Sequence, residues 1–162
     1  MGILISKKNQ SSQRNCFVDA NWGGKGNRST HGYLVMHGLN PIAWQSKRQT
    51  TIASSTAQAE YMALLFSATE TLWLYHLLHN ILKNTPPTLL LDNKTSVGIL
   101  TDWMNCKQTR HLIRDFSIIK EYVATRKLTL QCISTSNQLA DIMTKPLGSM
   151  KTKQFISEIN CL

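Results

Sequence analysis

Four acidic residues stand where they could bind a metal ion together. Asp19 and Asp92 follow the short apolar runs CFV and LLL, which are typical of buried strands. Glu60 lies early in a long segment without Gly or Pro, SSTAQAEYMALL onward, and Asp141 lies within QLADIM. Ligands of α/β sheets gather beyond the carboxyl ends of strands and near helix N-termini. We therefore expect Asp19 and Asp92 to meet if their strands are adjacent and parallel.

A cation would stabilise such a cluster of carboxylates, because like charges repel and their desolvation is costly. Oxygen-only ligands suit Mg²⁺ or Mn²⁺. Two such ions about 4 Å apart can activate water and stabilise the leaving oxygen of a phosphodiester. The chain has only nine acids, so four at the ends of elements favour a metal site. Taken alone, Glu60 is better explained as a solvated residue near a helix N-terminus, and only the other three acids favour a metal ligand.

Length and composition indicate one ordinary globular domain. The chain has 162 residues, 42% hydrophobic and 17% charged, which is enough to bury a core. No apolar run approaches 18 residues, and the first residues have the wrong charge order for a signal peptide. We expect a protein that is not secreted and does not enter a membrane. The four widely spaced cysteines are typical of reduced thiols in a cytoplasmic or nuclear protein.

The net charge of +9, from 18 Lys and Arg against nine acids, suggests a polyanionic partner such as nucleic acid. Lys107, Arg110 and Arg114 form one of several basic groups along the chain. General solubility is the alternative explanation of the charge.

Periodicity and turn residues predict the elements that must position the acids. Ser55 and Gln58 have the spacing of a capping box, so a helix should begin there and run to residue 82. Trp44 and Trp73 lie on apolar faces, so we expect both in the core. Strands are predicted at 15–20, 32–37, 42–46, 88–92 and 127–133, and further helices at 95–104, 108–126, 137–144 and 150–159. This order implies a mixed sheet with helices on its faces.

Seven stretches in this order resemble the ribonuclease H domain at the end of Ty1/copia-type retrotransposon polyproteins. They are FVDANW, RSTHGYLVMHG, PIAWQSKRQ, SSTAQAEYMAL, LLDNKTSV, QTRH and NQLADIMTKPL, and the likeness extends from Phe17 to Leu147. The resemblance implies a ribonuclease-H-like α/β fold, a mixed five-stranded sheet with helices on both faces. Residues 15–148 would form the domain, 149–162 its C-terminal helix, and 1–14 the remnant of a linker.

The resemblance also implies metal-dependent hydrolysis of the RNA strand in RNA–DNA hybrids, leaving 5′-phosphate ends. The family's four catalytic, metal-binding carboxylates correspond to Asp19, Glu60, Asp92 and Asp141. Two Mg²⁺ ions, for which Mn²⁺ could substitute, would be shared by Asp19 and Asp92, with Glu60 completing one site and Asp141 the other. A reverse transcriptase domain would precede this one in the parent polyprotein, which would act in a virus-like particle. The isolated domain is expected to be a monomer.

Substrate contacts are predicted at six positions, which are Asn21, Trp22, Asn93, Lys107, Arg110 and His111. Two departures from the family bear on them: Asn21 replaces the second Asp of D-A-D-W, and Leu112 and Ile113 replace the usual I-D after His111. Trp22 could stack on nucleic acid or brace its loop, and His111 could have a structural role.

Two rival functions remain open at this level. A domesticated or decayed domain would bind nucleic acid without cleaving it, and an integrase-like nuclease would act on DNA, normally with three carboxylates. Cleavage assays on a hybrid and on a DNA duplex separate the three hypotheses.

Overall fold

A computed structural model describes residues 13–82, 85–92 and 113–159. Five strands form a single sheet in the order β3-β2-β1-β4-β5. The strands are β1 (Arg14–Asn21), β2 (Thr30–His37), β3 (Asn40–Arg48), β4 (Thr88–Leu91) and β5 (Thr129–Cys132). The helices are α1 (Thr56–Leu82), α3 (Ile113–Ala124), α4 (Asp141–Thr144) and α5 (Ser149–Glu158), with short 3₁₀ turns at Lys25–Asn27 and Thr135–Asn137.

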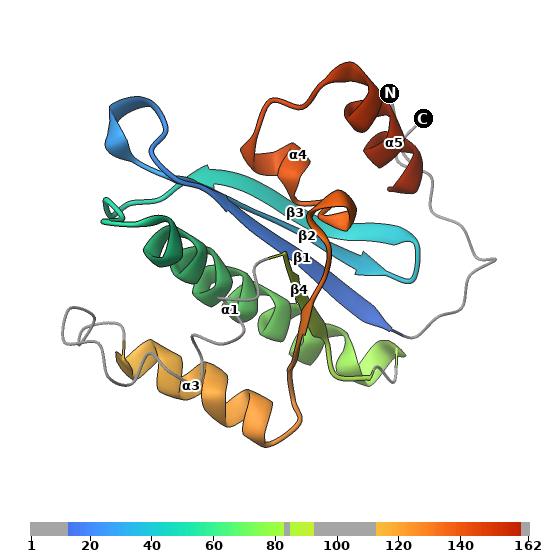
Figure 1. Cartoon of the computed structure of the whole chain (residues 1–162). Coiled ribbons are helices and arrows are strands. Elements are labelled where there is room, and N and C mark those ends of the chain that lie inside the picture. The colour runs from blue at the N-terminus through green and yellow to red at the C-terminus, as the bar shows by residue number, and fades with distance from the viewer. Residues whose placement is uncertain (1–12, 83–84, 93–112, 160–162) are drawn as a thin grey trace.

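The sheet is mixed, as the sequence predicts. β1, β2 and β3 form an antiparallel meander, whereas β4 pairs in parallel with both β1 and β5. Helices α1 and α3 lie on one face of the sheet, and α4 and α5 lie on the other (Figure 1). The predicted five-stranded sheet with helices on both faces is therefore confirmed.

Helix α1 begins directly after the predicted N-cap, Ser55, but the side chain of Gln58 bonds to Ser54 and not to Ser55. The backbone N–H of Gln58 donates to Ser55 Oγ at 3.2 Å, which is half of a capping box. The Gln58 side-chain oxygen accepts from both the backbone N–H and the hydroxyl of Ser54, each at 2.7 Å. Small residues on the inner side of α1, among them Ala59 and Ala63, are fully buried and let the helix lie close to the sheet.

The alternation of side chains along β2 divides the core between the two faces of the sheet. Tyr33 and Val35 belong to the larger apolar cluster under α1, whereas Leu34 and Met36 pack with the smaller cluster around Phe155 of α5. Phe155 is fully buried, so α5 is an integral part of this second cluster.

Some local predictions differ from the structure. β1 begins at Arg14, one residue before the predicted strand at 15–20, and ends one residue after it. The predicted helix at 137–144 is a 3₁₀ turn followed by the single turn of α4. The predicted helix at 95–104 lies outside the described residues.

The prediction that Trp44 and Trp73 are core residues is wrong. Their side chains are 50% and 59% exposed. Trp44 lies on β3, which has a neighbouring strand on one side only. Trp73 lies on α1, where its neighbours Thr71 and Leu72 are buried and Trp73 itself points away from the core. Among the described helices, none has both the length and the apolar character that crossing a membrane would require.

Candidate metal centre

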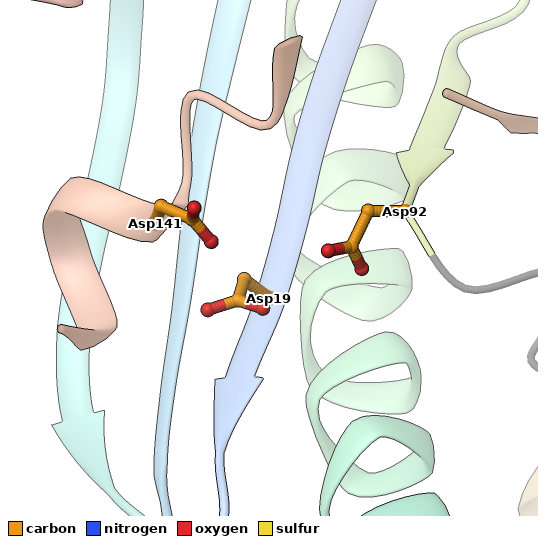
Figure 2. A group of neighbouring side chains, drawn as sticks. All are labelled: Asp19, Asp92 and Asp141. Carbon is orange, nitrogen blue, oxygen red and sulfur yellow. The ribbon is translucent and has the colours of Figure 1, made fainter. Parts of the chain in front are cut away.

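Parallel pairing of β1 with β4 brings two of the predicted carboxylates together. Phe17 pairs with Leu90, so Asp19, two residues further along β1, stands beside Asp92, which directly follows β4. Asp141 is the first residue of α4 and points at the same place from the other side (Figure 2). Each of these three carboxylates offers an oxygen, and the three oxygens lie within 4.8 Å of one another.

Glu60 stands beside this group without belonging to it. It lies in the second turn of α1 and lines a small cavity together with Asp19 and Asp92. The structure thus joins three of the four predicted carboxylates and places the fourth along the wall of the same cavity.

A glycine in β2 allows α4 to reach the centre. Gly32 pairs with Asp19 across the two strands. A Cβ on Gly32 would lie 2.5 Å from Met143 Cβ and 2.9 Å from Thr144 Cγ2, which is closer than real side chains approach. The side-chain amide of Asn21 also donates to the Thr144 carbonyl at 3.3 Å. Helix α4 is therefore packed directly on the backbone of the meander.

A buried glutamine fixes the chain that leads into α4. The Gln138 side-chain amide donates to the carbonyl oxygens of Val18 at 2.9 Å and Leu90 at 3.4 Å, so it bridges β1 and β4. Its carbonyl oxygen accepts from the backbone N–H of Ala140 at 3.3 Å. Gln138 is fully buried, and it ties the position of Asp141 to the two strands that carry Asp19 and Asp92.

Two lysines compensate the negative charge on the α4 side. Lys145 Nζ lies 2.9 Å from Asp141 Oδ1 and 3.3 Å from Asp19 Oδ2, and Lys151 Nζ lies 2.7 Å from Asp141 Oδ2. The Thr144 hydroxyl donates to Asp19 Oδ2. The two carboxylate side chains are only 5% and 3% exposed, whereas both lysines are 34% exposed.

These surroundings raise the pKa values of Asp19 and Lys145. Burial raises the pKa of Asp19, although the hydrogen bond from Thr144 and the charge of Lys145 oppose the shift, while the Asp141 carboxylate adds to it. Burial opposes protonation of Lys145, but the hydrogen bond to Asp141 and the charge of Asp19 outweigh it and raise the pKa of Lys145. Lys145 is thus held in its charged form by the carboxylates.

The donor set fits a hard divalent cation. Carboxylate oxygens from three different elements converge, with no nitrogen or sulfur ligand among them. Mg²⁺ and Mn²⁺ prefer such oxygen ligands. Asp19, Asp92 and Asp141 are the residues that would hold the ion or ions, with Glu60 near the Asp92 side.

The predicted substrate contacts are tested little by the structure. Trp22 is half-exposed, and its indole N–H donates to the Ala53 carbonyl at 3.0 Å, which anchors the loop and leaves one part of the ring open. Asn93, Lys107, Arg110 and His111 lie outside the described residues.

Sequence reasoning did not single out five residues that shape this centre, namely Gly32, Gln138, Thr144, Lys145 and Lys151. Two of these residues, Gly32 and Lys145, could have been recognised from the sequence pattern. A glycine inside a strand pattern indicates a close approach of another chain segment, which fits Gly32. Lys145 stands four residues after Asp141, a spacing at which opposite charges meet on a helix. The other three are defined by tertiary contacts.

Several solved structures with a similar fold are ribonucleases H. LC11-RNase H1, isolated from compost, is 17% identical, with a TM-score of 0.60 over 83% of this chain and 94% of that protein. The same enzyme has been solved in complex with an RNA/DNA hybrid, also at a TM-score of 0.60. RNase H1 from Halobacterium salinarum matches with a TM-score of 0.57 and 16% identity, over 82% of this chain and 94% of its own. The chain therefore has a ribonuclease-H-like fold.

Sequence relatives define the chain further. It is 32% identical over 162 residues to the retrovirus-related Pol polyprotein from transposon RE1 of Arabidopsis thaliana, and 31% identical to that from transposon RE2. The corresponding polyprotein from transposon TNT 1-94 of Nicotiana tabacum is 30% identical over 132 residues. The matches cover 98%, 99% and 80% of this chain but only 11%, 11% and 10% of the polyproteins. No protein-family model matches the chain.

The homologues of this chain are thus Pol polyproteins of copia-type transposons, which confirms the resemblance read from the seven motifs. The chain spans about a tenth of the length of such a polyprotein and has a ribonuclease-H-like fold.

Proposed function

We propose that this chain is a metal-dependent ribonuclease H that cleaves the RNA strand of RNA–DNA hybrids. The observation that carries the proposal is the meeting of Asp19, Asp92 and Asp141 within 4.8 Å, on a ribonuclease-H-like fold. The hybrid bound to LC11-RNase H1, a protein of the same fold, supports the choice of substrate.

The four carboxylates have distinct roles in this proposal. Asp19 lies between Asp92 and Asp141 (Figure 2), so we narrow the expected sharing to Asp19: it would bind both divalent ions, with Asp92 and Glu60 on one side and Asp141 on the other. When bound, the ions supply an activated water and stabilise the oxygen that leaves phosphorus. The protein holds the carboxylates in place before substrate arrives, through Gln138 and the close packing of α4 on Gly32.

Substrate binding would depend on the basic character of the chain. The net charge of +9 favours a polyanion, and Lys107, Arg110 and His111 are our candidates for phosphate contacts. Asn21, Trp22 and Asn93 adjoin the metal ligands in sequence and would face the nucleotides next to the cleaved bond. Contacts to 2′-hydroxyl groups would distinguish RNA from DNA.

The parent context is part of the same proposal. In a Pol polyprotein a reverse transcriptase domain would precede this one, and removal of the RNA template would follow DNA synthesis. We expect the isolated domain to be monomeric and to act in the cytoplasm, in a virus-like particle, or in the nucleus.

The test is cleavage of an end-labelled RNA–DNA hybrid with Mg²⁺ or with EDTA, resolved on a denaturing gel. We expect fragments of the RNA strand with 5′-phosphate ends in Mg²⁺ and none in EDTA. A matched DNA duplex should stay intact, and its cleavage would favour an integrase-like nuclease. Binding of the hybrid without cleavage in Mg²⁺ or Mn²⁺ would favour a decayed domain that only binds.

A further inference from the structure

The two sides of the carboxylate cluster are not equivalent. On one side, Asp19, Asp92 and Glu60 line a small cavity together with apolar neighbours. On the other side, the ammonium group of Lys145 lies between Asp19 and Asp141, 3.3 Å and 2.9 Å from their oxygens. The ammonium pairs at hydrogen-bonding distance with the two carboxylates that a shared metal ion would bind more closely, at about 2.0–2.1 Å for Mg²⁺.

The helical spacing of α4 places Lys145 beside Asp141. Lys145 directly follows the single turn that Asp141 begins, so the two residues are four apart and face each other at the helical spacing. The backbone N–H of Lys145 donates to the Asp141 carbonyl at 3.0 Å, which fixes the start of its side chain. Lys151 takes the other oxygen of Asp141 from α5, at 2.7 Å.

We infer that Lys145 is an internal cation that competes with one of the two metal ions for the oxygens of Asp19 and Asp141. This inference rests on the proposed function for the presence of two ions, and it specifies how they differ. Among the residues that the structure describes, the cavity on the Asp92 side is lined by carboxylates and apolar side chains and by no lysine, so an ion there meets no described ammonium group. An ion on the Asp141 side must first displace the Lys145 ammonium.

The side chain of Lys145 has room to leave. It is 34% exposed, and four methylene groups give its ammonium several alternative positions. Displacement leaves a positive charge at the mouth of the centre, where it can meet a substrate phosphate. Binding of the second ion is therefore weaker than that of the first, and it is easier when substrate is present.

The decisive measurement is Mn²⁺ binding to the full chain by titration calorimetry, without substrate. We expect two unequal sites in the wild type. In Lys145→Gln the weaker site should tighten by about tenfold or more, because a unit charge at contact distance has been removed. The matched control is Lys153→Gln, which removes an exposed lysine of α5 and the same formal charge. It should leave both affinities within about twofold. Identical isotherms for the wild type and Lys145→Gln would overturn the inference.

A second measurement keeps the inference testable if Lys145→Gln folds poorly. We expect Lys145→Gln to lower the melting temperature in EDTA, where the carboxylates lose their internal cation, and to lower it much less in saturating Mg²⁺. Lys145→Arg keeps the charge, so its second site should bind Mn²⁺ as weakly as that of the wild type. An equal loss of stability in EDTA and in Mg²⁺ would mean that Lys145 stays on the carboxylates when metal is bound, and the competition would be refuted.

The two proposals fail in different ways. If the chain cleaves no hybrid but Lys145→Gln still tightens Mn²⁺, the proposed function fails and the competition stands. If the hybrid is cleaved and Lys145→Gln leaves the affinity for Mn²⁺ unchanged, the proposed function stands and Lys145 is only an ion-pair partner of the carboxylates.

Discussion

The two sides of the metal centre are held in place by different kinds of structure. Asp19 and Asp92 belong to the ends of two paired strands, whose backbone hydrogen bonds set their separation. Asp141 lies on a single helical turn that is held by hydrogen bonds from the side chains of Gln138 and Asn21 and by close packing on Gly32. The strand side follows from regular secondary structure, whereas the α4 side depends on individual tertiary contacts. Substitutions can therefore affect the two sides separately.

The largest effect is expected from the strand side. Asp92→Asn should lower the rate of hybrid hydrolysis by about 10³-fold, an order seen when one catalytic electrostatic group is removed. The reason is that the amide keeps the shape of Asp92 but withdraws a charged ligand from the centre. Rates would be measured at saturating Mg²⁺, with circular dichroism to confirm the fold.

A matched control for this substitution is Glu121→Gln, since Glu121 is an acid of α3 outside the carboxylate cluster. Its rate should stay within about twofold of the wild type. Activity of Asp92→Asn within tenfold of the wild type would remove Asp92 from the list of metal ligands.

On the α4 side, Gly32→Ala tests the close packing between β2 and α4. The added methyl group would overlap Met143 and Thr144, so α4 must move away from the sheet and carry Asp141 with it. We expect a loss of about 1–3 kcal/mol in unfolding free energy, typical of overpacking. Mn²⁺ binding on the Asp141 side should weaken as well. Gly148→Ala is the control, because a Cβ there meets nothing within 4 Å. Equal stability of the two variants would show that the contact at Gly32 is not limiting.

Gln138→Met tests the other support of α4 with a side chain of similar volume. It would leave the carbonyls of Val18 and Leu90 without their side-chain donor inside the protein. The cost of such unsatisfied groups is about 1–3 kcal/mol, which chemical denaturation can measure. Gln154→Met on the exposed face of α5 is the control and should change stability by less than about 0.5 kcal/mol. A loss as small as the control's would mean that the bridge between β1 and β4 contributes little.

The same division explains how far the sequence could predict the structure. The strand side was predictable, because CFVD and LLLD are short apolar runs that end in an acid, and parallel pairing joins such ends. On the α4 side, the sequence alone marked Asp141 as an acid within the apolar segment QLADIM, and the family resemblance then matched it to a metal ligand. Nothing in local periodicity shows that Gln138 bridges two strands or that Lys145 reaches Asp19. These contacts link residues 48 to 126 positions apart, so no sequence window contains both partners.

The tryptophans show the converse limit. Apolar type and helical spacing predicted that Trp73 is buried, but α1 buries its neighbour Leu72 instead. A helix that is apolar on most sides offers no pattern to choose the inner one. Tertiary packing made that choice, and the same holds for Trp44 on an edge strand.

The smallest effect is expected at the residue that both sides share. Burial raises the pKa of Asp19, so between its ordinary and its raised pKa the folded protein binds more protons than the unfolded chain. The free energy of unfolding therefore falls as pH rises through that window, and the charged carboxylate destabilises the metal-free fold at neutral pH. Asp19→Asn removes the charge, and we expect it to be about 1 kcal/mol more stable than the wild type in EDTA, the usual size of a single-substitution effect.

Mg²⁺ should reverse this difference. A ligand that binds only the folded state stabilises it by about 2.7 kcal/mol at a hundred times its Kd, and Asp19→Asn has lost a carboxylate that both ions would share. The melting curves of the two proteins should therefore converge or cross as Mg²⁺ is added. In EDTA the gap should narrow below the ordinary pKa of an aspartate, because Asp19 is then protonated in both states. Parallel shifts with Mg²⁺ in both proteins would show that Asp19 does not join the two sides into one metal centre.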